Sequence, residues 1–436
     1  MEETGGFFGF LEKTVMGPMG KLAQFKVVQG IMAAGQATIP FTIVGSMFLV
    51  LQILPDVFPS LEGFFDVTFF RISPIYMSAN HATMGVLSLY FALSLGYGYT
   101  KILADQEDLD LNPFTGALLS FFGFLMTVPM IAFEHGVAVQ LDEGWERLGT
   151  IGIFTAIVLA IGSVQLYRVC IKKNWRIRMP EEVPEGVARA FTALIPTAVI
   201  GFVIMILNGA MIAMGTNLFD IVSWPFGFVR HLTENVWGLM LIYFLVHALW
   251  LVGIHGANVI LPLVQPIALY NMGLNTEGAN YVWAGEFANA YVTIGGSGAT
   301  LGLTLFLIFM AKSKQLKILG RASIGSGMFN INEPIIFGLP IIYNPFLAIP
   351  FFLAPMASVA IAFFAIRLEF VRPMIAQMPW PSPIGIGAFI GSGGDFMAAV
   401  VAIICALVAL LIYFPFIRAY DRKLAKEEGA NQIKAG

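Results

Sequence analysis

Stretches of about 20 apolar residues recur along most of this chain of 436 residues. An α-helix of about 20 apolar residues spans the hydrocarbon core of a bilayer with all of its backbone groups satisfied. Only 12% of the residues are charged, whereas about 25% are charged in soluble domains. The sequence therefore predicts an all-α, polytopic membrane protein. Apolar spans are expected near residues 27–53, 76–99, 114–133, 150–170, 190–214, 235–254, 346–366 and 396–417.

The second half of the chain departs from this regular pattern. Residues 255–270 are apolar but contain two prolines, residues 271–298 are polar and rich in Gly and Asn, and residues 299–311 are short. Residues 376–395 are again interrupted by Pro and Gly. Interrupted apolar segments at membrane depth occur where protein or a water-filled cavity covers them, and in transporters they indicate the binding site. We therefore expect about ten transmembrane helices, with re-entrant hairpins in the C-terminal half.

The basic residues of the chain predict its orientation and its domain boundary. Residues 168–189 carry six Lys or Arg side chains, and residues 418–426 are basic as well. By the positive-inside rule, both segments and both termini are expected in the cytoplasm. The predicted domains are residues 1–170, a scaffold, and residues 190–436, a substrate domain, joined by a basic linker at 171–189. Residues 1–26 are expected to form an amphipathic helix on the membrane surface.

Several classes of protein are excluded by what the chain lacks. The net charge of −3 indicates no nucleic-acid surface. The two cysteines, Cys170 and Cys405, have no metal-ligand spacing, and neither lies in an exposed basic loop as a phosphocysteine would. The sequence has no GxxxxGK[ST] phosphate loop. We therefore expect no metal, no cofactor and no ATP hydrolysis by the chain itself.

The segment 325–345, GSGMFNINEPIIFGLPIIYNP, places the carboxylate of Glu333 between apolar runs. An acidic residue at the centre of a bilayer costs about 2.5–3.5 kcal/mol on insertion scales, so such residues are usually functional. Glu333 and its neighbour Asn332 are therefore candidate site residues. The alternative interpretation is that Glu333 is solvated in an aqueous loop, where it caps a helix.

A second candidate group lies at the end of the span 235–254, in the sequence Trp250-Leu-Val-Gly-Ile-His255-Gly-Ala-Asn258. His255 lies between two glycines, where the backbone can bend and approach a ligand. An imidazole there can act as a hydrogen-bond partner or as a proton acceptor near neutral pH. The alternative is a membrane histidine that is paired with a backbone carbonyl.

Aromatic and amide side chains favour a sugar as the ligand. Trp380 lies between two prolines in the sequence MPWPSP, and a flat indole face packs well against the CH face of a sugar, as Trp250 also can. The alternative for each tryptophan is an interfacial aromatic belt. Asn80, His81 and Asn258 are further candidates for contact with sugar hydroxyl groups. Glu134, His135 and the acids at 142–146 are interpreted as solvated residues of an outside loop.

Three motifs resemble a known family: GIHGAN at 253–258, GGSGATLGL at 295–303 and NEPIIFGLPIIYNP at 332–345. They are similar to the membrane-embedded IIC component of the bacterial phosphoenolpyruvate-dependent phosphotransferase system, in its lactose, cellobiose and diacetylchitobiose branch. The similarity covers nearly the whole chain, and the Asn332-Glu333-Pro334 segment is its most specific part.

The resemblance implies a homodimer in the bacterial cell membrane, with the dimer contact in the N-terminal half and two re-entrant hairpins at the sugar site. It implies that a separate cytoplasmic IIB protein, phosphorylated on Cys by IIA, transfers phosphate to the 6-hydroxyl of a β-linked disaccharide. His255 and Glu333 would flank that hydroxyl, with Trp250, Asn332 and Trp380 around the sugar. The sugar itself stays open among cellobiose, diacetylchitobiose and lactose.

Two other functions remain open from the residues alone. One is a secondary transporter that moves a sugar together with H⁺, in which His255 and Glu333 would carry the proton. The other is a membrane-embedded glycosyl- or phosphotransferase that acts on lipid-linked sugar. Whether the chain counts as an enzyme stays uncertain, because in group translocation the phosphoryl donor lies on a separate protein. In either kind of transporter, we expect the C-terminal half to move as a rigid body against the other half.

Overall fold

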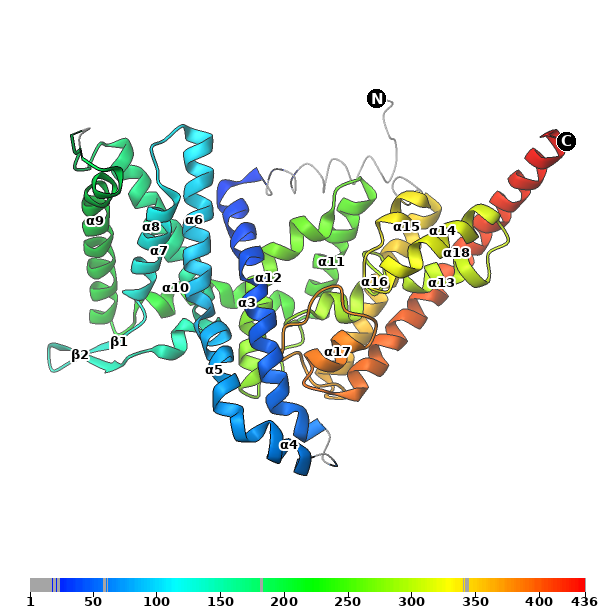
Figure 1. Ribbon diagram of the computed structural model, residues 1–436, viewed down its shortest axis with the longest axis horizontal. Coiled ribbons are helices and arrows are strands. Elements are labelled where there is room, and N and C mark those ends of the chain that lie inside the picture. The colour runs from blue at the N-terminus through cyan, green and yellow to red at the C-terminus, as the bar shows by residue number, and fades with distance from the viewer. Residues whose placement is uncertain are drawn as a thin grey trace. The chain divides into compact units, whose positions relative to one another are not determined.

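The computed structural model describes residues 18, 21, 24–57, 60, 62–180, 183–339, 341 and 345–435. The surface helix expected at residues 1–26 lies almost entirely outside the described residues, as do Pro340 and residues 342–344 of the Glu333 motif. The described residues fold mainly into helices, with one short β-hairpin (Figure 1).

The chain divides into two compact units. Unit 1 comprises Met1–Lys21, Ser46–Pro74 and Leu232–Gly436, and unit 2 comprises Leu22–Gly45 and Ile75–His231. The basic segment 171–189 lies inside unit 2, and its role as a linker between two domains stays a prediction. The division of labour between a dimerisation half and a sugar-binding half stays a prediction.

Unit 2 is built around three helices that pack against one another, α6, α7 and α8. Small residues allow this close approach: a Cβ added to Gly116 of α7 would lie 1.9 Å from Oγ1 of Thr100 in α6. The elements of unit 2, with those that it shares with unit 1, are α3 (Lys26–Val57), α5 (Ser73–Thr83), η4 (Met84–Val86), α6 (Leu87–Glu107), α7 (Pro113–Leu125), β1 (Met130–Glu134), β2 (Val137–Asp142), η5 (Trp145–Leu148), η6 (Thr150–Gly152), α8 (Ile153–Lys172), α9 (Glu185–Ala213) and α10 (Leu218–Thr233).

The predicted outside loop at 134–149 contains a regular element that the sequence did not predict. Strands β1 and β2 pair in antiparallel fashion, and the hairpin extends away from the helices of unit 2 (Figure 1). His135 (φ 50°) and Gly136 (φ 82°) form the two-residue turn, and two positive φ angles are what a tight hairpin requires. The side chains at 133–142 are exposed, so the loop is solvated as expected even though its backbone is paired.

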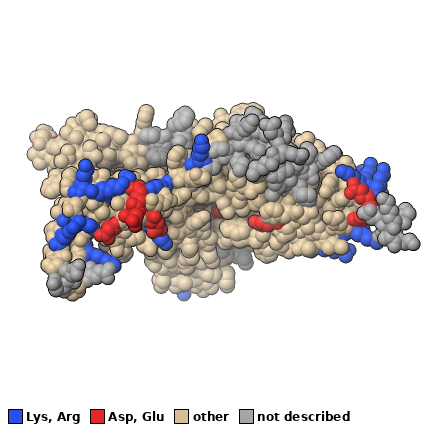
Figure 2. All heavy atoms as spheres, turned by 90° about the horizontal axis from the view of Figure 1, so that it is seen from above, with Lys and Arg blue, Asp and Glu red and all other residues tan. Residues whose placement is uncertain are grey.

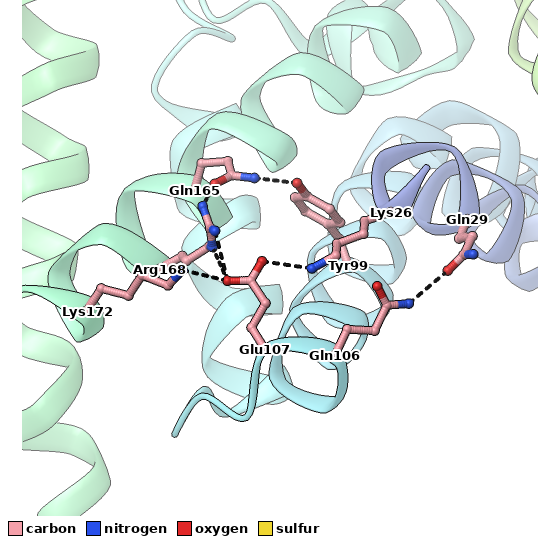
Figure 3. A network of polar contacts seen from close by, with 8 residues as sticks. All are labelled: Lys26, Gln29, Tyr99, Gln106, Glu107, Gln165, Arg168 and Lys172. Atoms are coloured by element: carbon pink, nitrogen blue, oxygen red, sulfur yellow. Dashed lines mark hydrogen bonds and ion pairs between the residues drawn. The ribbon is translucent and has the colours of Figure 1, made fainter. Parts of the chain in front are cut away.

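A single carboxylate links three helices of unit 2 (Figure 3). Glu107, the last residue of α6, accepts from Lys26 Nζ of α3 at 2.8 Å, and from Arg168 Nε at 2.8 Å and Lys172 Nζ at 2.7 Å, both of α8. The hydrogen bonds from Lys172 and Lys26, with a further contribution from Arg168, lower the pKa of Glu107 to about 2, although burial opposes the shift. Two of the six basic residues expected to mark the cytoplasmic loop therefore also hold helices together.

Unit 1 has its core where α16 packs against α11 and α18. Its polar site segments lie on short or irregular pieces: α13 has 9 residues, and α15 and α17 have 6 each. The remaining elements of unit 1 are α4 (Glu62–Thr68), η3 (Phe70–Ile72), α11 (Val236–Leu251), α12 (Gly256–Thr276), the π-helical turn η7 (Ala288–Val292), α13 (Leu301–Phe309), α14 (Lys314–Gly327), α15 (Glu333–Gly338), α16 (Pro345–Arg367), α17 (Ile386–Gly391) and α18 (Phe396–Ala435).

Two expected segments have a different helical structure. The span at 76–99 is divided into α5 and α6 by the 3-10 turn Met84–Val86. Conversely, residues 255–270 are not broken, because α12 continues through both Pro262 and Pro266 to Thr276. Proline is tolerated in membrane helices when neighbouring groups satisfy the freed carbonyls.

Six helices of the described chain are long and apolar enough to cross a membrane: Lys26–Gln52, Thr150–Lys172, Gly186–Ala213, Gly256–Thr276, Leu347–Arg367 and Phe396–Glu428. The helices Pro113–Leu125 and Val236–Leu251 are apolar but shorter. Charged side chains gather in a few clusters on the face shown in Figure 2, and most of that face is uncharged. The count of ten crossings and the re-entrant hairpins stay predictions.

Candidate functional site

His255 lies at the start of α12, where its side chain caps the helix. Its Nδ1 accepts a hydrogen bond from the backbone N of Asn258 at 3.2 Å. A neutral imidazole that accepts at Nδ1 carries its hydrogen on Nε2, so the cap sets which nitrogen can donate. Gly253, with φ 84°, turns the chain between α11 and α12, and Gly256 allows α12 to approach the carbonyl of Val246 so closely that a Cβ would lie 1.9 Å from it. The glycines on both sides of His255 are therefore required by its position.

Trp250 fixes the orientation of the His255 ring. The two ring centroids lie 4.3 Å apart, with an angle of 46° between the planes. Trp250 is only 4% exposed, and its Nε1 has no hydrogen-bond partner among the described residues. An indole N–H usually has a partner when buried, so this donor lacks the partner expected for it.

Glu333 begins α15 and faces His255. The distance from His255 Nε2 to Glu333 Oε1 is 3.9 Å, and the two side chains are 39% and 46% exposed. This separation is too long for a direct hydrogen bond, but one hydroxyl oxygen can lie about 2.8 Å from both atoms. Oε2 of Glu333 also has no partner in the part of the chain that the structure describes. The pair is therefore arranged as a donor and an acceptor on either side of a small polar group.

Two asparagines hold the loop that carries Glu333. Asn332 donates through Nδ2 to the carbonyl of Ser297 at 2.6 Å and to Oγ1 of Thr300 at 2.8 Å. Asn330 accepts from Gly295 N at 2.8 Å and donates through Nδ2 to three backbone carbonyls, at 3.0 to 3.3 Å, of Asn289, Trp380 and Ser382. Asn332, which we expected to line the sugar site, thus uses its amide hydrogens inside the protein.

The helix before this loop is anchored at its other end by α18. Asp421, which is 2% exposed, accepts from the backbone N of Lys312 at 2.8 Å and of Ser313 at 2.9 Å. Glu428, seven residues further along α18, accepts from Lys314 N at 2.9 Å and Gln315 N at 3.1 Å. Carboxylates at a helix N-terminus satisfy its free N–H groups and complement its dipole. Helix α14, which leads to Glu333, therefore has a fixed starting point.

The other predicted site residues are distributed as follows. Trp380 is 45% exposed, and its backbone carbonyl is held by Asn330, so its ring is accessible while its loop is fixed. Asn258 is exposed and contributes its backbone N to the cap of His255. Asn80 and His81 belong to unit 2, where Asn80 donates to the carbonyl of Gly45 at 2.9 Å and His81 is exposed. The structure thus brings Trp250, His255 and Glu333 together within unit 1.

Two residues near the site were missed at the level of sequence. Asn330 has φ 61°, and left-handed backbone of this kind is several-fold enriched in Asn, but no spacing rule identifies its three distant acceptors. Glu286 lies in the apolar run VWAGEFANAYV, and the rule that singled out Glu333 also applies to this acid. Among the described residues, no group of three or more His, Cys, Asp or Glu side chains could hold a metal ion.

Comparisons with known proteins find similar proteins over most of the chain. Residues 33–355 match the sequence model of the family described as "Phosphotransferase system, EIIC". The cellobiose-specific EIIC component of Geobacillus stearothermophilus is 32% identical over 452 residues, which cover 98% of this chain and 96% of that protein. The lactose-specific EIICB component of Streptococcus mutans is 31% identical over 408 residues, covering 90% of this chain and 68% of that protein.

A solved structure is similar over the whole chain. It is the crystal structure of the transporter ChbC, the IIC component from the N,N'-diacetylchitobiose-specific phosphotransferase system. The TM-score is 0.86 at 31% sequence identity, and the match covers 96% of this chain and 99% of that chain. The chain therefore belongs to the EIIC family of the phosphotransferase system, as a multi-pass component embedded in the membrane.

Proposed function

We propose that this protein takes up a β-linked disaccharide of the cellobiose or diacetylchitobiose type. His255 and Glu333 hold its 6-hydroxyl group, which receives a phosphoryl group from a phosphorylated cysteine on a IIB protein. The observation that carries the proposal is the 3.9 Å separation between His255 Nε2 and Glu333 Oε1, which leaves room for one hydroxyl oxygen in contact with both.

The chemistry needs a positioned nucleophile and a proton acceptor. As the 6-oxygen forms its bond to phosphorus, the S–P bond of the phosphocysteine breaks and the cysteine leaves as a thiolate. The hydroxyl proton passes to the carboxylate of Glu333, as it would to any general base. Nε2–H of His255 donates to the same oxygen and fixes its direction. Positioning of this kind supplies most of the catalysis in phosphoryl transfer.

The aromatic residues support a sugar as the substrate. The half-exposed ring of Trp380 offers a flat face for a sugar ring, and the buried Nε1–H of Trp250, beside His255, has no partner among the described residues. The names of two similar proteins refer to cellobiose and diacetylchitobiose. Both sugars are β-linked disaccharides with a free 6-hydroxyl group.

The partners and the transport cycle follow from the same proposal. A similar protein carries its C and B components in one chain, of which the match covers 68%, and this supports a partnership with a IIB protein. We propose a homodimer with cytoplasmic termini that works by alternating access, in which the C-terminal half moves as a rigid body against the N-terminal half. Asn80 and His81 remain candidates for contact with sugar hydroxyl groups.

The test compares uptake and binding in one variant. Membrane vesicles that contain the wild-type protein, with IIA, IIB and phosphoenolpyruvate supplied, should accumulate cellobiose 6-phosphate or its diacetylchitobiose equivalent. We expect Glu333→Gln to lose this product by at least ~100-fold, because a general base contributes about 10²–10⁴ to the rate, while sugar binding is partly retained.

The matched control is Glu277→Gln, since Glu277 is an exposed glutamate at the end of α12 in the same unit, and it should accumulate product like the wild type. Normal phosphorylation by Glu333→Gln would disprove the role as a base. Accumulation of unmodified sugar that requires a proton gradient, and neither IIB nor phosphoenolpyruvate, would instead favour the proton-coupled transporter.

A further inference from the structure

Glu286 is a second acid inside unit 1, separate from Glu333. It lies between α12 and η7, where Val282, Trp283, Ala284 and Phe287 around it are buried. Its Oε1 accepts from Gln377 Nε2 at 2.5 Å, and its Oε2 accepts from Asn289 Nδ2 at 2.8 Å. Within the described residues it forms no ion pair, so neutral amides alone hold this carboxylate in place.

The carboxylate retains capacity for further hydrogen bonds. Glu286 and Asn289 are both partly exposed, although the residues on either side of each are buried. A carboxylate has about four acceptor positions, and the two amides use two of them. Gln377 is 2% exposed, and its Oε1 has no partner among the described residues. Buried polar atoms without a partner need an explanation such as a missing ligand or water.

A chain of hydrogen bonds connects Glu286 to the candidate site. Asn289, which donates to Glu286, has a backbone carbonyl that accepts from Asn330 Nδ2 at 3.3 Å. The same Nδ2 donates to the carbonyl of Trp380 at 3.0 Å, and Gln377 is only three residues before Trp380 in the chain. Glu286 therefore belongs to the wall that carries both the Trp380 ring and the loop before Glu333.

We propose that Glu286, with Asn289 and Gln377, forms a second sugar subsite that binds hydroxyl groups of the ring that is not phosphorylated. This inference rests on the proposed function and adds a determinant of specificity to it. The two amide bonds fix the carboxylate, so its remaining lone pairs point in set directions toward sugar hydroxyl groups. A site built to bind a hydroxyl group strongly rejects an analogue that lacks it, because the buried acceptor is then left unpaired.

A thermodynamic cycle between residue and ligand tests the subsite. Calorimetry measures binding to three purified proteins: the wild type, Glu286→Gln and the control Glu277→Gln. The ligands are cellobiose and its monodeoxy analogues, each of which lacks one hydroxyl group on the ring remote from the phosphorylated 6-hydroxyl. We expect the wild type and the control to bind one such analogue about 10- to 100-fold more weakly than cellobiose, as for hydrogen bonds to charged groups. Glu286→Gln should bind the two sugars within a few-fold of each other.

Non-additivity of this kind requires contact between the carboxylate and the missing hydroxyl group. If each analogue binds more weakly than cellobiose by the same factor in Glu286→Gln as in the wild type, Glu286 only supports the Trp380 loop and the subsite is disproved. Should Glu286→Gln fail to fold, Glu286→Asp keeps the charge but withdraws it by one methylene, and it should lose the same discrimination.

The outcomes also separate this inference from the proposed function. The subsite alone fails if the wild type binds cellobiose and Glu333→Gln abolishes phosphorylation, but the effects of Glu286→Gln and of the missing hydroxyl group on affinity are additive. If the wild type binds neither cellobiose nor diacetylchitobiose, the proposed function fails, and the subsite with it.

Discussion

Asn330 connects three backbone segments through one amide group. Its Nδ2 donates to the carbonyls of Asn289, Trp380 and Ser382. In Asn330→Asp, a carboxylate oxygen would face these three carbonyl oxygens instead of a donor. We expect the variant to lose about 1–3 kcal/mol of stability, as for buried groups left unsatisfied, and to bind the disaccharide more weakly, because the Trp380 loop is released. Thermal unfolding in detergent and sugar calorimetry measure the two effects.

The control for this prediction is Asn174→Asp, since Asn174 is exposed, lies in unit 2 and accepts a hydrogen bond from Arg178 through Oδ1, which an aspartate can also do. It should unfold at the wild-type temperature. An Asn330→Asp protein that unfolds like the wild type and binds sugar normally would show that the three carbonyls do not depend on this amide.

The candidate site could be predicted only in part from single residues. Glu333 and His255 stand out in the sequence because a polar group among apolar neighbours is costly in a membrane, and the structure places them 3.9 Å apart. By contrast, Asn330 and Asn332 work through partners 32 to 52 positions away in the chain, and no local pattern indicates such distant partners. Their role in holding the loop therefore required the fold.

At the scale of helices, the contact between α3, α6 and α8 depends on the ionised form of Glu107. Its pKa of about 2 in the folded protein lies below the ordinary value of 4.5. The charged form therefore adds stability that is fully present above pH 4.5 and is lost as the pH falls toward 2. We expect Glu107→Gln to unfold at a lower temperature than the wild type at pH 7, and the difference to disappear as the pH approaches 2.

The pH series uses thermal unfolding of the purified protein, with Glu134→Gln as the control, since Glu134 lies on the exposed hairpin. The control should follow the wild type at every pH. Added salt should also reduce the difference at pH 7, because charges near the surface are screened. A constant difference between wild type and Glu107→Gln from pH 7 to pH 2 would mean that packing, and not charge, accounts for the effect.

The sequence predicts best the helices whose spans are strongly apolar, and these include α16, which contains Pro350 and Pro355. The expected spans 150–170, 190–214 and 346–366 correspond to α8, α9 and α16 within about five residues at each end. The expectation of an interrupted segment at residues 255–270 is wrong, because α12 continues through Pro262 and Pro266. A proline breaks a helix in water through the lost hydrogen bond and a steric clash, but a membrane favours any arrangement that keeps the backbone helical.

At the scale of the whole molecule, the orientation in the membrane rests on one apolar helix between two accessible segments. The span Thr150–Lys172, which includes α8, lies between the exposed hairpin and the exposed residue Lys173. The native cysteines, Cys170 and Cys405, are both buried, so a membrane-impermeant maleimide should leave the wild type unlabelled. Ala138→Cys on the hairpin, Lys173→Cys and Lys423→Cys on α18 each add one accessible thiol.

By the positive-inside rule, Ala138→Cys should react in intact cells, whereas Lys173→Cys and Lys423→Cys should react only after the cells are permeabilised. Reaction of all three from the same side would contradict a membrane crossing by α8. If Lys173→Cys and Lys423→Cys react in intact cells but Ala138→Cys does not, the chain has the opposite orientation in the membrane. It would then place the basic segment 171–189 outside the cell, contrary to the positive-inside rule.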